Sequence, residues 1–198
     1  MLPEFSKGRL SLALIAMGCG LAGCNADPTL YDLAPVAGSA QAGGPAVVEV
    51  RTPVVAQSLD RDEIVRQNRD YRLKIAKGDA WSAPLGALLG RTLAIDLAGR
   101  LPGSTVFAQN DAVAATPMAY VEVTVTAFNE DQQGNARLEG MLSVHRAGGE
   151  MPVVATPVQL RTTLDTRDTA HLVAALSAMT GTLADQAASK IRSLPTTP

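Results

Sequence analysis

The chain has 198 residues, with 17 basic and 19 acidic side chains, two cysteines and a formal net charge of −2. That balance, together with an aromatic content of 4%, argues against a nucleic-acid-binding protein and against a strongly anionic partner surface. The length suits one domain with a proper hydrophobic core.

The N-terminus has the pattern of a bacterial lipoprotein signal peptide. Lys7 and Arg9 form a short basic start, and residues 10–23 carry no charge. This run is shorter than the roughly 20 apolar residues that span a bilayer, and it ends in small residues. The sequence Leu-Ala-Gly-Cys ending at Cys24 matches the lipobox, whose thiol takes a diacylglyceryl group and whose small residues fit the signal peptidase. We therefore expect a signal peptide over residues 1–23 and lipid attachment at Cys24.

The cysteines and the residue after Cys24 support an exported, anchored protein. Cleavage there removes Cys19 with the signal, so the mature domain keeps neither a free thiol nor a disulfide. No second long apolar run exists, so the lipid is the expected membrane attachment. Asn25 stands where an aspartate is the common inner-membrane retention signal. We expect the protein on the periplasmic face of the outer membrane rather than the inner one.

Residues 24–45 are predicted to be a flexible tether. The stretch 37–44, Ala-Gly-Ser-Ala-Gln-Ala-Gly-Gly, has almost nothing to bury. Fully extended, about 20 residues reach roughly 70 Å. Tyr31-Asp32-Leu33 interrupts this stretch, either as an edge strand on the domain or as part of the tether.

The domain proper, residues 46–198, is predicted to open with a buried strand over Ala46 to Arg51, which Pro53 ends. Glu63 to Gln67 and Asp70 to Ile75 then predict a hairpin. Its charges alternate in sign, so it is either a solvated hairpin or a charged docking surface. The candidate contacts of that docking surface are Asp60, Arg61, Glu63 and Arg66.

A helix is predicted to follow, with Ser82 as its N-cap and leucines recurring every four residues until Leu101. Asp96 and Arg100 lie off that apolar stripe and are spaced to pair on the exposed side. A short strand over Ser104 to Phe107 completes a strand, helix and strand, which suggests a crossover connection.

The second half predicts an antiparallel meander and a final helix. Tyr120 to Phe128, Ala136 to His145 and Val153 to Leu164 alternate between apolar and polar residues. A helix from Asp168 to Ile191, capped by Asp168 or Thr166, has an apolar stripe that should pack on the meander. The predicted fold class is α/β, a single domain with a mixed β-sheet, an antiparallel meander and two main helices packed on it.

The sequence gives little support for a catalytic function. His145 and His171 are both expected at ordinary surface positions, and we find no nucleophile motif, metal-ligand spacing or phosphate loop. Carboxylates do cluster at Asp60, Asp62 and Glu63, but arginines beside them make mutual pairing the simpler interpretation. We expect no enzyme, no cofactor, no metal and no nucleic acid.

Several motifs resemble a known family. Leu59-Asp60-Arg61 followed by Ile64-Val65 resembles the "Leu-Asp-Arg-x-x-Ile-Val" element of the PqiC-type lipoproteins, the ABC-type transport auxiliary lipoproteins. Trp81 with Pro84-Leu85 and the helix after it is similar to the tryptophan-led helix of that family. Tyr31-Asp32-Leu33 is similar to its "Tyr-x-Leu" start. In this chain Asp62 replaces the usual proline after "Asp-Arg".

The resemblance implies a single α/β domain that serves MCE-type systems, which move phospholipids between the inner and outer membranes. Such lipoproteins are thought to meet the end of a periplasm-spanning MCE-domain protein, and related members form rings, so self-association is expected here. On this basis Asp60 to Arg66 is the candidate contact surface, and Trp81 is a structural anchor in the core. Two alternatives stay open, a direct lipid-binding carrier and an envelope-spacing protein that binds peptidoglycan.

Overall fold

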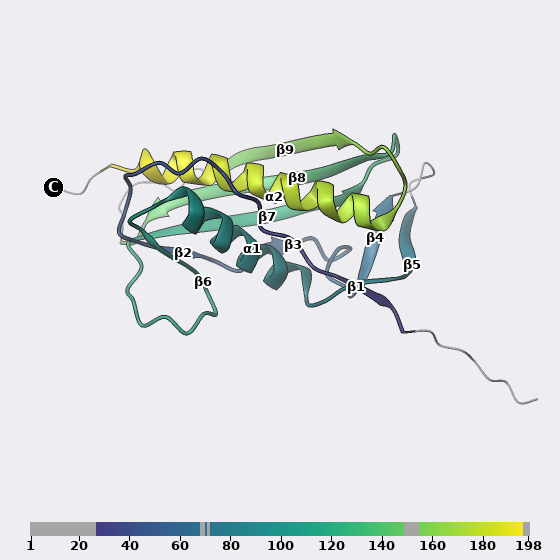
Figure 1. Cartoon of the computed structure of the whole chain (residues 1–198), viewed down its shortest axis with the longest axis horizontal. Helices are drawn as coiled ribbons and strands as arrows, with labels where there is room; N and C mark the ends of the chain where they lie inside the picture. Colours follow the sequence, from purple (N-terminus) through teal and green to yellow (C-terminus); the bar gives the residue numbers. More distant parts are fainter. Residues whose placement is uncertain (1–26, 68–69, 71, 149–154, 196–198) are drawn as a thin grey trace, which may run out of the picture.

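The computed structural model describes residues 27–67, 70, 72–148 and 155–195, and its elements are drawn in Figure 1. The predicted signal peptide and the lipid attachment site Cys24 lie outside these residues. So does the predicted hairpin turn at Asn68 and Arg69.

A mixed sheet forms the centre of the domain. Its strand order is β6-β2-β7-β8-β9, with β3 also paired to β7. The strands are β2 (Val47–Val50), β3 (Val54–Val55), β6 (Thr105–Ala108), β7 (Ala119–Glu130), β8 (Asn135–Arg146) and β9 (Ala155–Thr163). β2 pairs in parallel with β6 and β7, whereas β7, β8 and β9 are antiparallel. The predicted crossover and the predicted meander are both confirmed.

Two helices, α1 (Leu85–Arg100) and α2 (Thr169–Arg192), cover one face of this sheet (Figure 1). The apolar stripe predicted for α2 is buried, and it packs against β7, β8 and β9. Asp168 caps α2, because its side chain accepts a hydrogen bond from the Ala170 amide. The predicted Ser82 cap is wrong: α1 begins after Pro84 and has no side-chain cap.

A second, smaller sheet joins β1 (Thr29–Tyr31), β5 (Leu73–Trp81) and β4 (Glu63–Gln67), in the order β1-β5-β4. The predicted β4–β5 hairpin is confirmed, but β5 continues to Trp81 through an irregular stretch between its two pairings with β4. The fold therefore contains two sheets. The small sheet lies at one end of the molecule and the C-terminus at the other (Figure 1).

Residues 32–45, here called the strap, lie along the helices instead of forming a free linker (Figure 1). Leu33 is buried in the core. Backbone groups hold the rest: the Ala34 amide donates to Ser177 Oγ at 3.1 Å and the Val36 amide donates to Asp96 Oδ1 at 2.7 Å. Because these hydrogen bonds use main-chain atoms, the strap can pack on the helices although most of its side chains are small or polar.

The expected surface pair Asp96 and Arg100 is wrong, because the strap and α2 cover that side of α1. Their exposed fractions are 3% and 2%. Arg100 Nη1 donates to the carbonyls of Val36 and Asp96 at 2.8 and 2.9 Å, and Nη2 donates to that of Gly181 at 3.0 Å. Its ion pair is with Asp185, at 2.5 Å.

Candidate functional site

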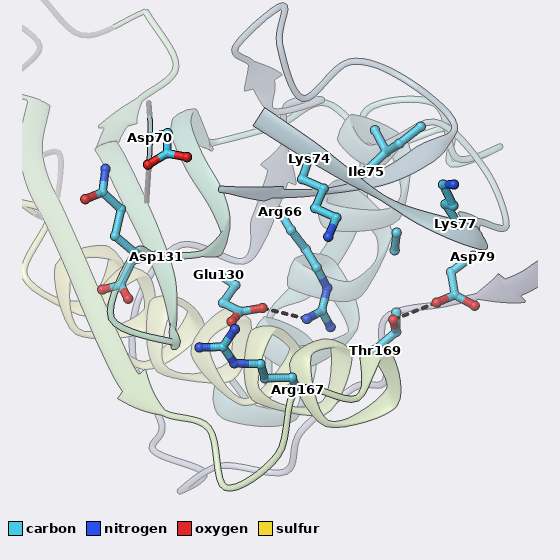
Figure 2. A pocket seen from close by; sticks show the side chains of 12 residues that line it. Arg66, Asp70, Lys74, Ile75, Lys77, Asp79, Glu130, Asp131, Arg167 and Thr169 are labelled. Atoms are coloured by element: carbon cyan, nitrogen blue, oxygen red, sulfur yellow. Dashed lines mark hydrogen bonds and ion pairs between the residues drawn. The ribbon is translucent and has the colours of Figure 1, made fainter. Parts of the chain in front are cut away.

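An open, charged cleft of about 860 Å³ lies beside the small sheet (Figure 2). The β4–β5 hairpin, the turn between β7 and β8, and the start of α2 surround it. Its charged lining residues are Arg66, Asp70, Lys74, Lys77, Asp79, Glu130, Asp131 and Arg167. Segments far apart in the sequence thus contribute ionic side chains of both signs to one site.

A buried ion pair forms part of this lining. Arg66 on β4 pairs with Glu130 at the end of β7, with 2.5 Å between Nη1 and Oε2. Their side chains are 14% and 8% exposed. Arg66 Nη2 is buried and has no hydrogen-bond partner among the described residues. An arginine offers five donors, and this one leaves a buried donor unsatisfied in the wall of the cleft.

The turn between β7 and β8 is fixed by Asp131. Asp131 Oδ1 accepts hydrogen bonds from the backbone amides of Gln133 and Asn135, both at 2.9 Å, and Gly134 supplies the positive φ of +88°. Burial by itself raises the pKa of Asp131. The hydrogen bonds from Asn135 and Gln133 and the charge of Arg161 outweigh that effect and hold the pKa below its ordinary value.

The start of α2 is tied to the small sheet by one strong hydrogen bond. Thr169 Oγ1 donates to Asp79 Oδ2 at 2.6 Å, as Figure 2 shows. Tyr31 of β1 lies close by, and its pKa is raised by burial and by the charges of Asp79 and Asp168. These carboxylates already have partners or lie beside the helix N-terminus, which favours negative charge.

Three further cations line the cleft and form no ion pair with another described residue. No ion pair between described residues involves Lys74, Lys77 or Arg167. Lys74 lies directly opposite Arg66 in the hairpin register, which brings both side chains toward Glu130 (Figure 2). The charged lining as a whole contains four basic and four acidic side chains. In the described part of the chain, no cluster of three histidine, cysteine or acidic residues could hold a metal ion.

The structure separates the four predicted contact residues. Asp60, Arg61 and Glu63 are exposed at the base of the hairpin, whereas Arg66 turns inward to Glu130 rather than to its carboxylate neighbours. Trp81, the predicted anchor, is buried at the end of β5, with its ring centroid 6.1 Å from that of Phe128.

Both histidines lie at partly or fully exposed positions beside a carboxylate. His145 Nε2 is 3.5 Å from Glu122, and His171 Nδ1 is 3.3 Å from the cap residue Asp168. No serine or threonine hydroxyl is hydrogen-bonded to either ring among the described residues. The arrangement therefore offers no activated nucleophile of the kind that acyl or phosphoryl transfer requires.

The sequence predicted the hairpin side of the cleft as a possible docking surface but missed Glu130, Lys77 and Arg167. One signal was available in the sequence Arg-Leu-Lys-Ile-Ala-Lys-Gly of residues 72–78, which contains three basic residues and no acidic one. In a chain of net charge −2, that local excess of positive charge is informative.

The interior between helices and sheet is closely packed. The apolar gap lined by Leu89, Leu93, Val123, Val125 and Leu183 has a total empty volume of about 190 Å³ and leaves no room for a water-sized sphere. Pockets that bury a small molecule usually hold roughly 300–1,000 Å³. This gap is therefore a packing defect of the core rather than a ligand chamber.

Comparisons with known proteins agree with this architecture. Residues 29–188 match the family described as the ABC-type transport auxiliary lipoprotein component. The match spans most of the chain, and the protein belongs to this family. No curated protein matches the sequence significantly.

Two crystal structures have a similar fold. One, described as an uncharacterized protein, superimposes with a TM-score of 0.68 and 21% identity, covering 83% of this chain and 99% of that chain. Protein XCC0632 from Xanthomonas campestris gives a TM-score of 0.63 and 14% identity, covering 82% and 94%. At these identities the likeness shows the fold alone.

Neither described helix has the length and apolar content that crossing a bilayer demands.

Proposed function

We propose that this chain is the docking subunit of an MCE-type transport system that moves phospholipid between two membranes. Its lipid on Cys24 holds it on the periplasmic face of the outer membrane, where it receives the end of an MCE-domain protein and helps to maintain the envelope. The observation that carries this proposal is the lipobox ending at Cys24 in a member of the transport auxiliary lipoprotein family.

The structure supports a role that works through surfaces. The core is closely packed, the cleft is open and ionic, and each histidine lies beside a carboxylate near the surface. Asp60, Arg61 and Glu63 are free to meet a partner, whereas Arg66 already has Glu130. The proposed partner contact therefore consists of these three exposed residues at the base of the hairpin.

Two experiments test the proposal in sequence. Radiolabelled palmitate should enter the product, and a Cys24→Ala variant should lose membrane attachment. A pull-down from detergent-solubilised envelope should then recover an MCE-domain protein. An Asp60→Lys/Glu63→Lys variant should recover much less of it, while Glu122→Lys/Asp165→Lys, with the same charge change at two other exposed positions, should not. Recovery of no MCE-domain protein under mild conditions would count against the docking role.

The alternative, a carrier that holds an acyl chain between sheet and helices, has less support. The 190 Å³ apolar gap is smaller than the pockets that enclose such ligands. Native mass spectrometry of the acyl-free chain distinguishes the two roles, because a carrier should retain phospholipid after purification and a docking subunit should not.

A further inference from the structure

The first part of β5 combines exposed apolar and basic side chains. Leu73 and Ile75 are 53% and 38% exposed, although both are large aliphatic residues on a strand. Arg72, which directly precedes the strand, and Lys74 alternate with them, while Lys77 has the same parity as Leu73 and Ile75; all three basic residues are exposed. Strand alternation places Leu73 and Ile75 on one face and the residues between them on the other. The result is a short amphipathic strand with a net charge of +3 over residues 72–77.

The same end of the molecule is where the expected anchor arrives. Cys24 precedes the first residue of β1, Thr29, by only five positions, and β1 pairs directly with β5. Five residues span at most about 18 Å when fully extended. Because the strap is packed on the helices, residues 32–45 do not act as a long flexible linker between the lipid and the domain. A lipid on Cys24 must therefore lie close to the small sheet.

Charge and chemistry then specify what faces this strand. Basic residues at a bilayer surface are attracted by anionic headgroups, and their aliphatic stems allow neighbouring apolar side chains to enter the interface. Lys77 and Lys74 also line the cleft, so headgroup phosphates have access to its unpaired cations. The C-terminal end of α2 lies at the opposite end of the molecule from the small sheet (Figure 1).

We infer that Arg72 and the first part of β5, residues 73–77, form a membrane-contacting surface that rests on anionic phospholipid headgroups, with Leu73 and Ile75 in the interface and Arg72, Lys74 and Lys77 on the phosphates. This inference rests on the proposed lipid anchor for its geometry. It fixes the orientation of the domain: the small sheet faces the bilayer, and the far end of the large sheet faces the periplasm.

Thiol labelling tests the orientation, because an acylated Cys24 leaves the mature chain with no other reactive cysteine. An environment-sensitive fluorophore is placed on Leu73→Cys or Ile75→Cys in the lipidated protein, reconstituted in phosphatidylethanolamine–phosphatidylglycerol vesicles. The expected result is a blue-shifted emission that lipid-borne quenchers reduce. The control is Val113→Cys, an exposed residue of the connection between β6 and β7. Identical spectra at Leu73→Cys and Val113→Cys overturn the inference.

Vesicle partitioning tests the charges without the anchor. Each Lys or Arg near an anionic surface contributes about five-fold in affinity, so Arg72→Gln/Lys74→Gln/Lys77→Gln in the mature chain carrying Cys24→Ser should lose about 100-fold. A matched triple variant, Arg91→Gln/Arg161→Gln/Arg192→Gln, should lose far less. Neutral phosphatidylcholine vesicles should bind all forms equally weakly.

The outcomes separate the two proposals. If the lipidated protein does not float with vesicles, the proposed lipid anchor is wrong. Partitioning of the Cys24→Ser chain then still tests whether β5 contacts the membrane. If the β5 triple variant partitions normally but loses the MCE-domain protein, the strand is a protein contact and the membrane inference is overturned. Loss of partitioning with normal recovery of that protein supports the inference.

Discussion

Two buried arginines show how differently the two ends of this domain use charge. Arg100 lies between α1, α2 and the strap, where it donates four hydrogen bonds to three carbonyls and Asp185. Arg66 lies at the cleft with one carboxylate partner, Glu130, and one nitrogen without any partner among the described residues. The first arginine holds chain segments together, while the second leaves one donor unsatisfied in the wall of the cleft.

The comparison suggests a general criterion for this fold. A buried cation whose donors are nearly all used is a structural clamp, because every bond ends on another part of the same chain. A buried cation in the wall of an open cleft, with one ionic partner and one unsatisfied donor, is held by fewer internal bonds. Mutations at the two sites should therefore affect stability and surface function in different proportions.

The largest expected effect is at the clamp. Arg100→Ala removes a buried side chain at 2% exposure together with its hydrogen bonds to the Val36 and Gly181 carbonyls, and should lower the free energy of unfolding by about 3–5 kcal/mol. Urea unfolding followed by circular dichroism measures this change. Arg91→Ala is the matched control, since its ion pair with Asp32 is half exposed and should be worth less than about 1 kcal/mol. Equal losses in both variants would contradict a structural role of the strap.

At the cleft, the second arginine should behave differently. Arg66→Met alone leaves a buried Glu130 carboxylate uncompensated and should lower the free energy of unfolding by about 3 kcal/mol. The double variant Arg66→Met/Glu130→Leu should return to within about 1 kcal/mol of the original protein. Arg100→Met/Asp185→Ala should show no such recovery, because Asp185 is only one of several partners. A double-mutant cycle in urea measures both, and recovery at both sites would remove the distinction.

A glycine under the strap gives a smaller effect. A Cβ at Gly181 would stand 2.9 Å from Val36 Cβ, so Gly181→Ala must displace the strap. The added methyl group should cost about 1–3 kcal/mol of stability through overpacking. This cost exceeds the roughly 1 kcal/mol gained in helix propensity, so the variant should be less stable. Gly99→Ala, with open space around its Cβ, should gain up to about 1 kcal/mol. Thermal melts compare them, and two equal gains would mean that the strap does not rest on Gly181.

The sequence predicted the large sheet and its helices because their contacts follow simple periodicities. Alternation at Val121, Val123 and Val125 identifies β7, and four-residue spacing identifies α1. The strap escaped this method, since its backbone bonds leave no apolar pattern in residues 37–44. For the same reason the positions of Asp96 and Arg100 on the polar side of α1 suggested solvent, although another segment covers them.

The cleft was predictable only in part. Arg66 was identified as a candidate because its neighbours form a family motif, but its partner Glu130 is 64 residues away. Periodicity specifies which face of one element a residue occupies and not which distant element it meets. The irregular stretch of β5 was a second obstacle to predicting the cleft. It interrupts the alternation of the strand before Asp79, so the sequence gives no sign that Asp79 accepts a hydrogen bond from Thr169.

The smallest expected effect is a pair of opposite pH dependences. Burial raises the pKa of Asp96 above its ordinary value of 3.8, although the Val36 amide and Arg100 act against it. The folded state then binds the proton more tightly, so this contribution to stability is present below about pH 3.8 and is lost as the pH rises through the folded pKa. Asp131 has a lowered pKa, so its contribution is present above about pH 3.8 and is lost as the pH falls through its folded pKa.

Neutral substitutions make these two signs measurable. Relative to the original protein, Asp96→Asn should become more stable as the pH rises from about 4 toward neutrality, since it removes a buried carboxylate whose Oδ2 has no partner among the described residues. Asp131→Asn should be less stable at neutral pH, and the difference should vanish in acid, because the charge that its turn amides stabilise is then absent. Urea unfolding at a series of pH values gives both curves. If the stability difference from the original protein changed with pH in the same direction for both variants, the proposed contrast between Asp96 and Asp131 would be wrong.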